Sequence, residues 1–233
     1  MKKMFLIGLA SGLLAACSTT PTFDASPDAE QTYDGLSPMK GTVLDAVWAR
    51  TDIDVTGYDK IMLEGIGVEF RPVKGPYSGR GSRSSAGIVR SSQTEFPLDP
   101  DTQKLFIEEI RGAFVEEMGK SDVFTLVDEP GPDVLKLSVG LLDVLSRVPP
   151  ETVGSSRIFL DRVGEATLVL ELRDSESNAI LIRAADRRAA ERPGTAIESS
   201  RVTNMAEVRR LGRRWATILK DGLDTLLSEG VSE

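Results

Sequence analysis

Apolar and polar residues alternate in three stretches of the chain, a period that turns every second side chain toward a core and predicts a β-strand. In the clearest stretch, 135–141, every second residue is Leu or Val. The predicted strands are 62–70, 123–127, 135–141, 165–173 and 179–188, and the alternation is in the first, third and fourth of them. The polar stretch 174–178 joins the last two and is typical of a hairpin turn.

Two longer stretches carry apolar residues at the spacing of an amphipathic helix. The first begins at Pro100, directly after Asp99, an order typical of a helix N-terminus. The second covers 205–228, where Asn204 and Glu207 have the spacing of a capping box. The pattern therefore predicts one helix between the first two strands and another at the end of the chain.

This order of elements predicts a two-layer α/β sandwich of the α+β type, with a mixed sheet of about five strands and two long helices on one face. The strands that flank the first helix are expected to be parallel, because a crossover joins them. The later strands are expected to form an antiparallel meander. Gly212 and Gly222 lie inside the second helix, where each costs about 1 kcal/mol against alanine; this favours close packing on the sheet there.

The amino terminus has the composition of a secretory signal peptide. Lys2 and Lys3 precede an apolar stretch, 4–14, that is shorter than the roughly 20 residues needed to span a bilayer. Residues 1–16 are therefore expected to be removed during export.

A lipobox ends this signal: Leu14, Ala15, Ala16 and Cys17. Small side chains fit the narrow site of a signal peptidase, and Cys17 carries the only thiol of the chain, which thioether attachment of a diacylglycerol requires. We therefore expect cleavage after Ala16 and lipidation of Cys17. The alternative is an ordinary secreted protein whose cysteine lies at the cut by chance.

Residues 17–34 are rich in Ser, Thr, Pro and Asp without periodicity, which predicts a disordered tether after the lipid. A single α/β domain is expected over 35–233. A diacylglycerol with an amide-linked acyl chain would hold it at a membrane permanently. Because Ser18 is not the aspartate that tends to retain lipoproteins at the inner membrane, we expect the periplasmic face of the outer membrane.

Composition narrows the chemistry of this domain. The chain has no histidine, which removes Ser-His-Asp and Cys-His catalysis and the commonest ligand of transition metals. Its formal net charge of −8 argues against binding to nucleic acid. We therefore expect no cofactor and no metal site.

Three patterns resemble catalytic or binding motifs. Ser37 and Lys40 have the spacing of serine–lysine acyl enzymes, but Pro38 argues against the helix that this spacing requires. The glycine-rich stretch Gly79–Ser84 lacks the last glycine of a dinucleotide-binding loop. Neighbouring carboxylates could serve a glycosidase, although on amphipathic helices they more often form a solvated face. These pairs are Glu108 and Glu109, Glu116 and Glu117, and Asp221 and Asp224.

Basic residues gather in two places. The stretch 71–92 has no acidic residue and these basic ones: Arg71, Lys74, Arg80, Arg83 and Arg90. A second group lies near the start of the last helix: Arg209, Arg210, Arg213 and Arg214. The simpler interpretation is a flexible loop and a solvated helix face. The alternative is a contact with an anionic partner, such as phospholipid head groups, cell-wall carboxylates or an acidic protein surface.

Several short motifs together resemble one family. They are Tyr33–Ser37, Tyr58–Met62, Gly131–Leu135, Glu171–Ser175, Asp186–Arg188 and Trp215–Ala216. On these residues the chain resembles the bacterial lipoproteins grouped as domain of unknown function 3313. The resemblance covers most of the chain after the signal peptide and implies an envelope lipoprotein, but it brings no activity with it.

The leading hypothesis for function is therefore an accessory lipoprotein, not an enzyme, that binds an envelope protein partner in envelope assembly, transport or integrity. The second hypothesis is a carrier or sensor of a small amphiphile that lies in a cleft between the sheet and the helices. A glycan-active enzyme that uses paired carboxylates comes third.

Overall fold

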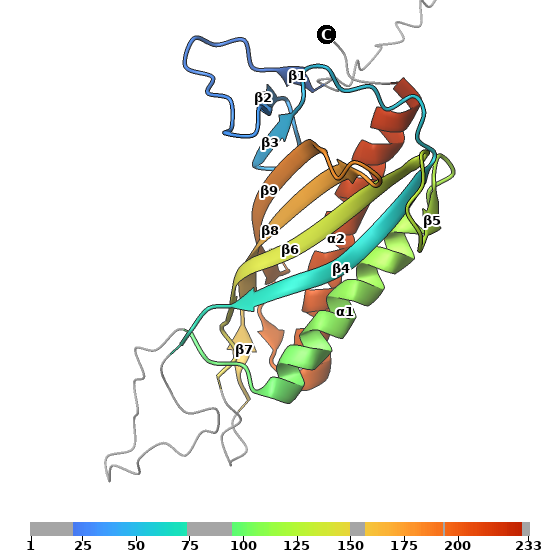
Figure 1. The fold of residues 1–233 in the computed structure, drawn as a ribbon. Helices are drawn as coiled ribbons and strands as arrows, with labels where there is room; N and C mark the ends of the chain where they lie inside the picture. The colour runs from blue at the N-terminus through green and yellow to red at the C-terminus, as the bar shows by residue number, and fades with distance from the viewer. Residues whose placement is uncertain (1–20, 74–94, 150–156, 193, 230–233) are drawn as a thin grey trace, which may run out of the picture.

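The computed structural model describes residues 21–73, 95–149, 157–192 and 194–229 (Figure 1). The signal peptide and Cys17 lie outside these ranges. The elements are β1 (Thr22–Phe23), β2 (Ser37–Lys40), β3 (Ala46–Ala49), β4 (Lys60–Phe70), α1 (Pro100–Met118), β5 (Thr125–Val127), β6 (Val134–Ser146), β7 (Phe159–Leu160), β8 (Arg162–Asp174), β9 (Ile180–Glu191), β10 (Ile197–Glu198) and α2 (Arg201–Glu229).

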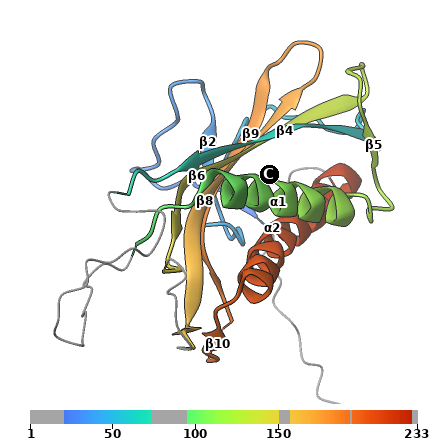
Figure 2. The same cartoon turned by 90° about the horizontal axis from the view of Figure 1, so that it is seen from below.

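The main sheet has the strand order β1-β2-β3-β9-β8-β6-β4-β5. Strand β4 is parallel to β5 and to β6, whereas β6, β8 and β9 are antiparallel neighbours. Both helices cover one face of this sheet (Figure 2). The predicted α+β sandwich, its parallel pair around the first helix and its antiparallel meander are therefore confirmed.

The sheet is larger than the predicted five strands, because it has eight in the described part of the chain. The extra strands β1, β2 and β3 come from residues 21–50, and β3 adds this segment to β9 through pairs from Ala46↔Ala185 to Ala49↔Ile182. Each has two to four residues, and Pro38 lies inside β2. Strands this short carry no readable alternation, so the sequence pattern did not indicate them.

The predicted disordered tether also differs from the structure. From residue 21 onward the chain packs on the domain, where Thr22 pairs with Lys40 across β1 and β2. Asp34 binds Arg183 of β9 at 2.7 Å, and the Tyr33 ring lies 5.9 Å from the Arg183 guanidinium carbon. The folded domain therefore includes residues 21–34, which the prediction assigned to the tether.

The core lies between the sheet and the helices. Alternate residues of β8 are buried there, as their spacing predicts: Ala166, Leu168, Leu170 and Leu172. The helices contribute Phe106, Ile110, Phe114 and Trp215, each at most 7 % exposed. Burial of a large apolar side chain contributes about 1.5–3 kcal/mol, so this layer supplies most of the stability of the fold.

The two helices touch each other at Gly212. A Cβ atom at this position would lie 3.1 Å from Ala113 Cβ and 3.1 Å from Ile110 Cδ1. Gly212 therefore permits close contact with α1 and not, as predicted, with the sheet. Gly222 has nothing within 4 Å of a Cβ position, so the predicted close packing at Gly222 is wrong.

The start of α2 differs from the predicted capping box. The helix begins at Arg201, because the Ser200 hydroxyl accepts a hydrogen bond from the Thr203 N–H at 3.2 Å and the Thr203 hydroxyl accepts one from the Ser200 N–H at 2.9 Å. Asn204 instead binds Ser199, and the buried Glu207 forms ion pairs with arginines. A reciprocal cap four residues earlier therefore replaces the predicted one.

A buried carboxylate joins three parts of the fold. Asp186 of β9 is 1 % exposed and accepts a hydrogen bond from Trp215 Nε1 of α2 at 2.6 Å. It also accepts hydrogen bonds from the Arg188 guanidinium and from the Asp45 N–H, the latter at 3.2 Å. Since a buried charge is stable only when its lone pairs are bound, these donors are required at their places.

The two glycines of α2 give a matched test of the helix contact. We expect Gly222→Ala to raise the free energy of unfolding by about 0.5–1 kcal/mol, because the new methyl group lies in open space and only helix propensity changes. Gly212→Ala should instead lower it, by about 1–3 kcal/mol, since the Ala113 methyl group is fixed to α1 and cannot move aside. Urea unfolding of both variants measures the difference. An equal increase in the free energy of unfolding in both variants would show that the helices are not in contact at Gly212.

The buried carboxylate is tested by Asp186→Asn, which preserves volume and removes the charge. We expect a loss of about 3 kcal/mol of unfolding free energy, because the Arg188 guanidinium then lacks its counter-ion. Asp221→Asn is the control, since Asp221 is an exposed carboxylate whose ion pair with Lys220 reaches the solvent, and pairs of this kind contribute little. Urea unfolding followed by tryptophan fluorescence gives both values, and equal losses would contradict the role assigned to Asp186.

Candidate functional site

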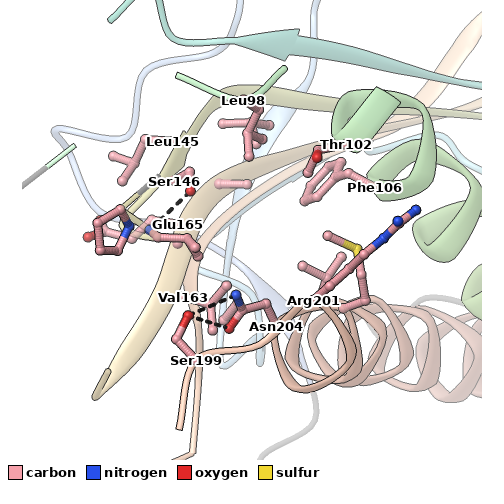
Figure 3. Close-up of a pocket in the computed structure, with 18 of the residues that line it drawn as sticks. Leu98, Thr102, Phe106, Leu145, Ser146, Val163, Glu165, Ser199, Arg201 and Asn204 are labelled. Carbon is pink, nitrogen blue, oxygen red and sulfur yellow. Dashed lines mark hydrogen bonds between the residues drawn. The ribbon is translucent and has the colours of Figure 1, made fainter. Parts of the chain in front are cut away.

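A pocket of about 420 Å³ lies between one end of the sheet and the first turns of both helices (Figure 3). The sheet contributes the end of β6 and the start of β8, and the helices contribute residues from Asp99 to Phe106 and from Arg201 to Leu211. A second pocket of about 350 Å³ adjoins it and shares five lining residues: Pro97, Leu98, Val144, Leu145 and Ser146.

Small residues of the sheet leave room for this pocket. Gly164, Ala166 and Ala190 line it where larger side chains would fill the space. At Gly164 a Cβ atom would collide with the Leu145 carbonyl oxygen, so the close approach of β6 and β8 requires glycine. The buried side chains of Phe106, Val163, Val208 and Leu211 complete a wall that is mostly apolar.

The two carboxylates in the lining are bound by neighbouring groups. Asp99 caps α1, where the hydrogen bond from the Thr102 hydroxyl is the main cause of its lowered pKa. Glu165 accepts a hydrogen bond from Arg147 Nε at 3.0 Å, and this arginine is the main cause of the lowered pKa of Glu165. Both groups are therefore charged at neutral pH, so neither supplies the protonated acid that a glycosidase requires.

The neutral polar groups of the lining also have partners. Ser146 Oγ accepts a hydrogen bond from the Val148 N–H at 3.1 Å, and the Asn204 amide donates one to Ser199 Oγ at 3.0 Å (Figure 3). In the described part of the chain, Arg201 is the remaining charged residue of the lining and has no such partner. The pocket is thus an apolar space with one cation at the start of α2.

The structure separates the serine–lysine pair of the sequence. Ser37 and Lys40 lie on β2, not on a helix. Ser37 Oγ accepts a hydrogen bond from the Gln31 amide at 3.1 Å, whereas Lys40 binds Asp24 at 2.8 Å. The spacing therefore does not bring amine and hydroxyl together. The glycine-rich stretch 79–84 lies outside the described residues.

The paired carboxylates of the helices lie outside the pocket. In the described chain, five of them form ion pairs: Glu109 with Arg209, Glu116 and Glu117 with Arg213, and Asp221 and Asp224 with Lys220. Within the described ranges, no cluster of three or more Asp, Glu or Cys side chains could hold a metal ion. The ion pairs of Glu109, Glu116 and Glu117 therefore link α1 to α2, and the carboxylates do not converge on a site.

The arginine groups of the sequence also have internal partners. Arg71 binds Asp143 and Glu95, while Lys74, Arg80, Arg83 and Arg90 lie outside the described residues. On α2, Arg209 and Arg213 bind α1 at 2.7 and 2.8 Å, and Arg210 binds Glu207. Arg214 is exposed. The arginines on α2 thus mainly form ion pairs within the chain, and few of them are available to an anionic partner.

The motifs that carry the family resemblance meet one another in the structure. The Tyr58 hydroxyl donates to Asp174 at 3.0 Å, and Lys60 binds Asp133. Asp186 likewise meets Trp215 of the last motif. None of these residues lines the pocket, so their role is to join distant segments of the fold.

The sequence did not indicate this pocket, because its residues come from five separate segments. The predicted strand 135–141 ends before Val144, and the predicted helix 205–228 starts after Arg201. Ser200 and Thr203, which have the spacing of a short cap, were the available signal for the true start of α2.

Comparison with known proteins finds one family model that matches most of the chain. A family model described as "Protein of unknown function (DUF3313)" matches residues 25–219. No curated protein matches the sequence.

Several solved structures are similar over most of the chain, and two serve as examples. The PelC dodecamer from Paraburkholderia phytofirmans is 9% identical, with a TM-score of 0.32 over 74% of this chain and 96% of that one. A minor lipoprotein from Acinetobacter baumannii is 11% identical, with a TM-score of 0.31 over 71% of this chain and 95% of that one. Similarities of this size carry no argument about function. Among the described helices, neither α1 nor α2 is both long and apolar enough to cross a membrane.

The lowered pKa of Glu165 predicts how stability depends on pH. At pH 7 the wild-type chain should be more stable than Glu165→Gln, because the charged form binds Arg147 and Arg187. This difference should persist down to the ordinary glutamate pKa of about 4.3 in the unfolded chain and shrink as the pH falls through the lower pKa of the folded state. Urea unfolding at several pH values measures it. A difference that stayed constant down to pH 2 would show that the ion pair does not stabilise the fold.

Proposed function

We propose that this chain, which belongs to the DUF3313 family, is a lipid-anchored envelope lipoprotein whose pocket binds the apolar chain of a small amphiphile. The pocket between the sheet and the first turns of the helices carries this proposal. Of the hypotheses drawn from the sequence, a carrier or sensor fits it best, because that hypothesis requires a cleft in this place.

The size and lining of the pocket support an amphiphile. Its volume of about 420 Å³ lies in the range of about 300–1,000 Å³ that is usual for small-molecule sites. The wall is mostly apolar, and each of its carboxylates is bound: Glu165 by Arg147, and Asp99 by the N–H groups at the start of α1. An alkyl chain could enter without leaving either carboxylate of the lining unpaired.

The predicted anchor supports the same function. Lipidation of Cys17 would hold the domain at a membrane surface, and we propose the periplasmic face of the outer membrane. An anchored domain meets amphiphiles where they are concentrated, so it can act as a carrier or sensor without leaving the membrane.

A free strand edge favours the other hypothesis, an envelope protein partner. Strand β4 pairs with β5 only from Lys60 to Met62. Along the outer edge from Leu63 to Phe70, no described strand pairs with it. Such an edge can accept a strand from another protein. An accessory role in envelope assembly or transport is therefore the second candidate.

Photo-crosslinking tests the pocket. A hexadecanol that carries a diazirine on its alkyl chain is irradiated with the full lipidated chain in its membranes. We expect label on peptides with pocket residues such as Leu145 and Val208. Met205→Trp, which narrows the pocket, should reduce this label about tenfold, as a loss of about 1.4 kcal/mol in binding would.

The control is Ile218→Trp, the same change at a partly buried residue of α2 that does not line the pocket. It should be labelled like the wild type. Equal label in both variants, or label only outside the pocket, would overturn the proposal. Crosslinks from Leu63–Phe70 to an envelope protein, without pocket label, would establish the second candidate instead.

A further inference from the structure

One charged side chain of the pocket lining has no partner in the described chain. Asp99 accepts hydrogen bonds from N–H groups at the start of α1, and Glu165 forms ion pairs with arginines. The Arg201 side chain, in contrast, forms no ion pair or hydrogen bond with any described residue. An unpaired cation beside an apolar wall is the arrangement that an anionic head group and an apolar tail would complete.

Arg201 also lies at a position of its helix where a cation is unfavourable. It is the first residue of α2, and the first turn of this helix has no acidic residue. A helix N-terminus carries partial positive charge, so a cation there is unfavourable and an anion favourable. In α1, by contrast, Asp99 and Asp101 compensate this charge. The start of α2 therefore concentrates positive potential at the pocket, and its first turn has no acidic side chain to offset this potential.

Arg201 and the apolar wall are placed so that one amphiphile could contact both. Figure 3 shows the Arg201 side chain extending from the start of α2 toward α1, on the side of Phe106. Phe106, Val208 and Leu211 lie deeper, between the helices and the sheet. A head group at Arg201 would thus leave its chain pointing along the apolar wall.

The two carboxylates of the lining are compensated, so neither opposes an anion strongly. Asp99 lies at the positive N-terminus of α1 and accepts its N–H groups. Glu165 is surrounded by Arg147, Arg162 and Arg187, each within 3.5 Å of one of its oxygens. This part of the lining is therefore not negative as a whole. Arg71, which lines the adjoining pocket, is bound by Asp143 and Glu95 and so is not available to a ligand.

We infer that the pocket takes an anionic amphiphile and that Arg201 binds its carboxylate or phosphate head group. This inference rests on the proposed function and adds the sign of the head group to it. The planar guanidinium presents two parallel N–H groups to the paired oxygens of either head group. An anion at this place also offsets the positive end of α2.

The test compares three diazirine probes that share one alkyl chain: the fatty acid, the monoalkyl phosphate and the alcohol. They are applied to the full lipidated chain in its membranes, with and without excess unlabelled palmitic acid. In the wild type the acid or the phosphate should label pocket peptides about tenfold more than the alcohol, as one charge-assisted hydrogen bond would give. Arg201→Gln should lower this label to the level of the alcohol and leave the alcohol unchanged.

Arg214→Gln is the matched control, because Arg214 is exposed on the same helix and does not line the pocket. It should behave like the wild type. Preference for the acid or for the phosphate identifies the head group, and either supports the inference. Equal pocket label by all three probes, unaffected by Arg201→Gln, would overturn it while the proposed function stands. If no probe labels the pocket, the proposed function fails and the inference fails with it.

Discussion

The buried carboxylate of Asp186 is the constraint on which the arrangement of this domain depends. An isolated charge in a protein interior costs several kcal/mol, so its donors must stay in place for the fold to be stable. Those donors come from α2, from β9 itself and from the segment before β3: Trp215, Arg188 and the Asp45 N–H. A non-directional apolar core would allow α2 to slide along the sheet. The hydrogen bond from Trp215, at 2.6 Å, fixes its position.

With α2 fixed, the shape of the pocket follows from two local features, a helix contact and a register shift in the sheet. The helices touch at Gly212, and the pocket lies on the N-terminal side of this contact, beside Val208 and Leu211. On the sheet, β6 has a register shift after Leu142, where Asp143 takes a positive φ of 55°. This conformation is unfavourable for most residues, although Asp tolerates it better than most.

Ion pairs on the other side of the sheet hold this shift in β6. Arg71 and Arg187 both bind Asp143, and the Arg71 guanidinium lowers the pKa of this carboxylate to about 2. The shift turns Val144 and the residues that follow it toward the pocket. Charges on the open face thus shape an apolar space on the covered face.

The elements that the sequence predicted correctly are those whose pattern is local and long. Strand β8 has four alternating buried residues, and the Asp99-Pro100 start of α1 is a cap that its neighbours determine. The missed strand β3 is stable only because β9 lies beside it, a contact between residues more than 130 positions apart. The pocket was missed for the same reason, since Leu98, Leu145, Val163 and Val208 meet only in the folded chain. The hydrogen bond between Asp186 and Trp215 likewise joins two motifs, and nothing in the sequence pattern indicates that these motifs meet.

A lipid anchor changes what such a pocket must achieve. A ligand that resides in the same membrane as the anchored domain is present at high effective concentration, so weak binding is sufficient for occupancy. High affinity would need an enclosed site with many contacts, whereas the described pocket offers an apolar wall and one free cation. Under the proposed function, selection among amphiphiles therefore depends on the head group more than on the chain. An apolar wall discriminates poorly between chains that differ by a methylene, but a cation at the start of a helix discriminates clearly between an anion and a neutral group.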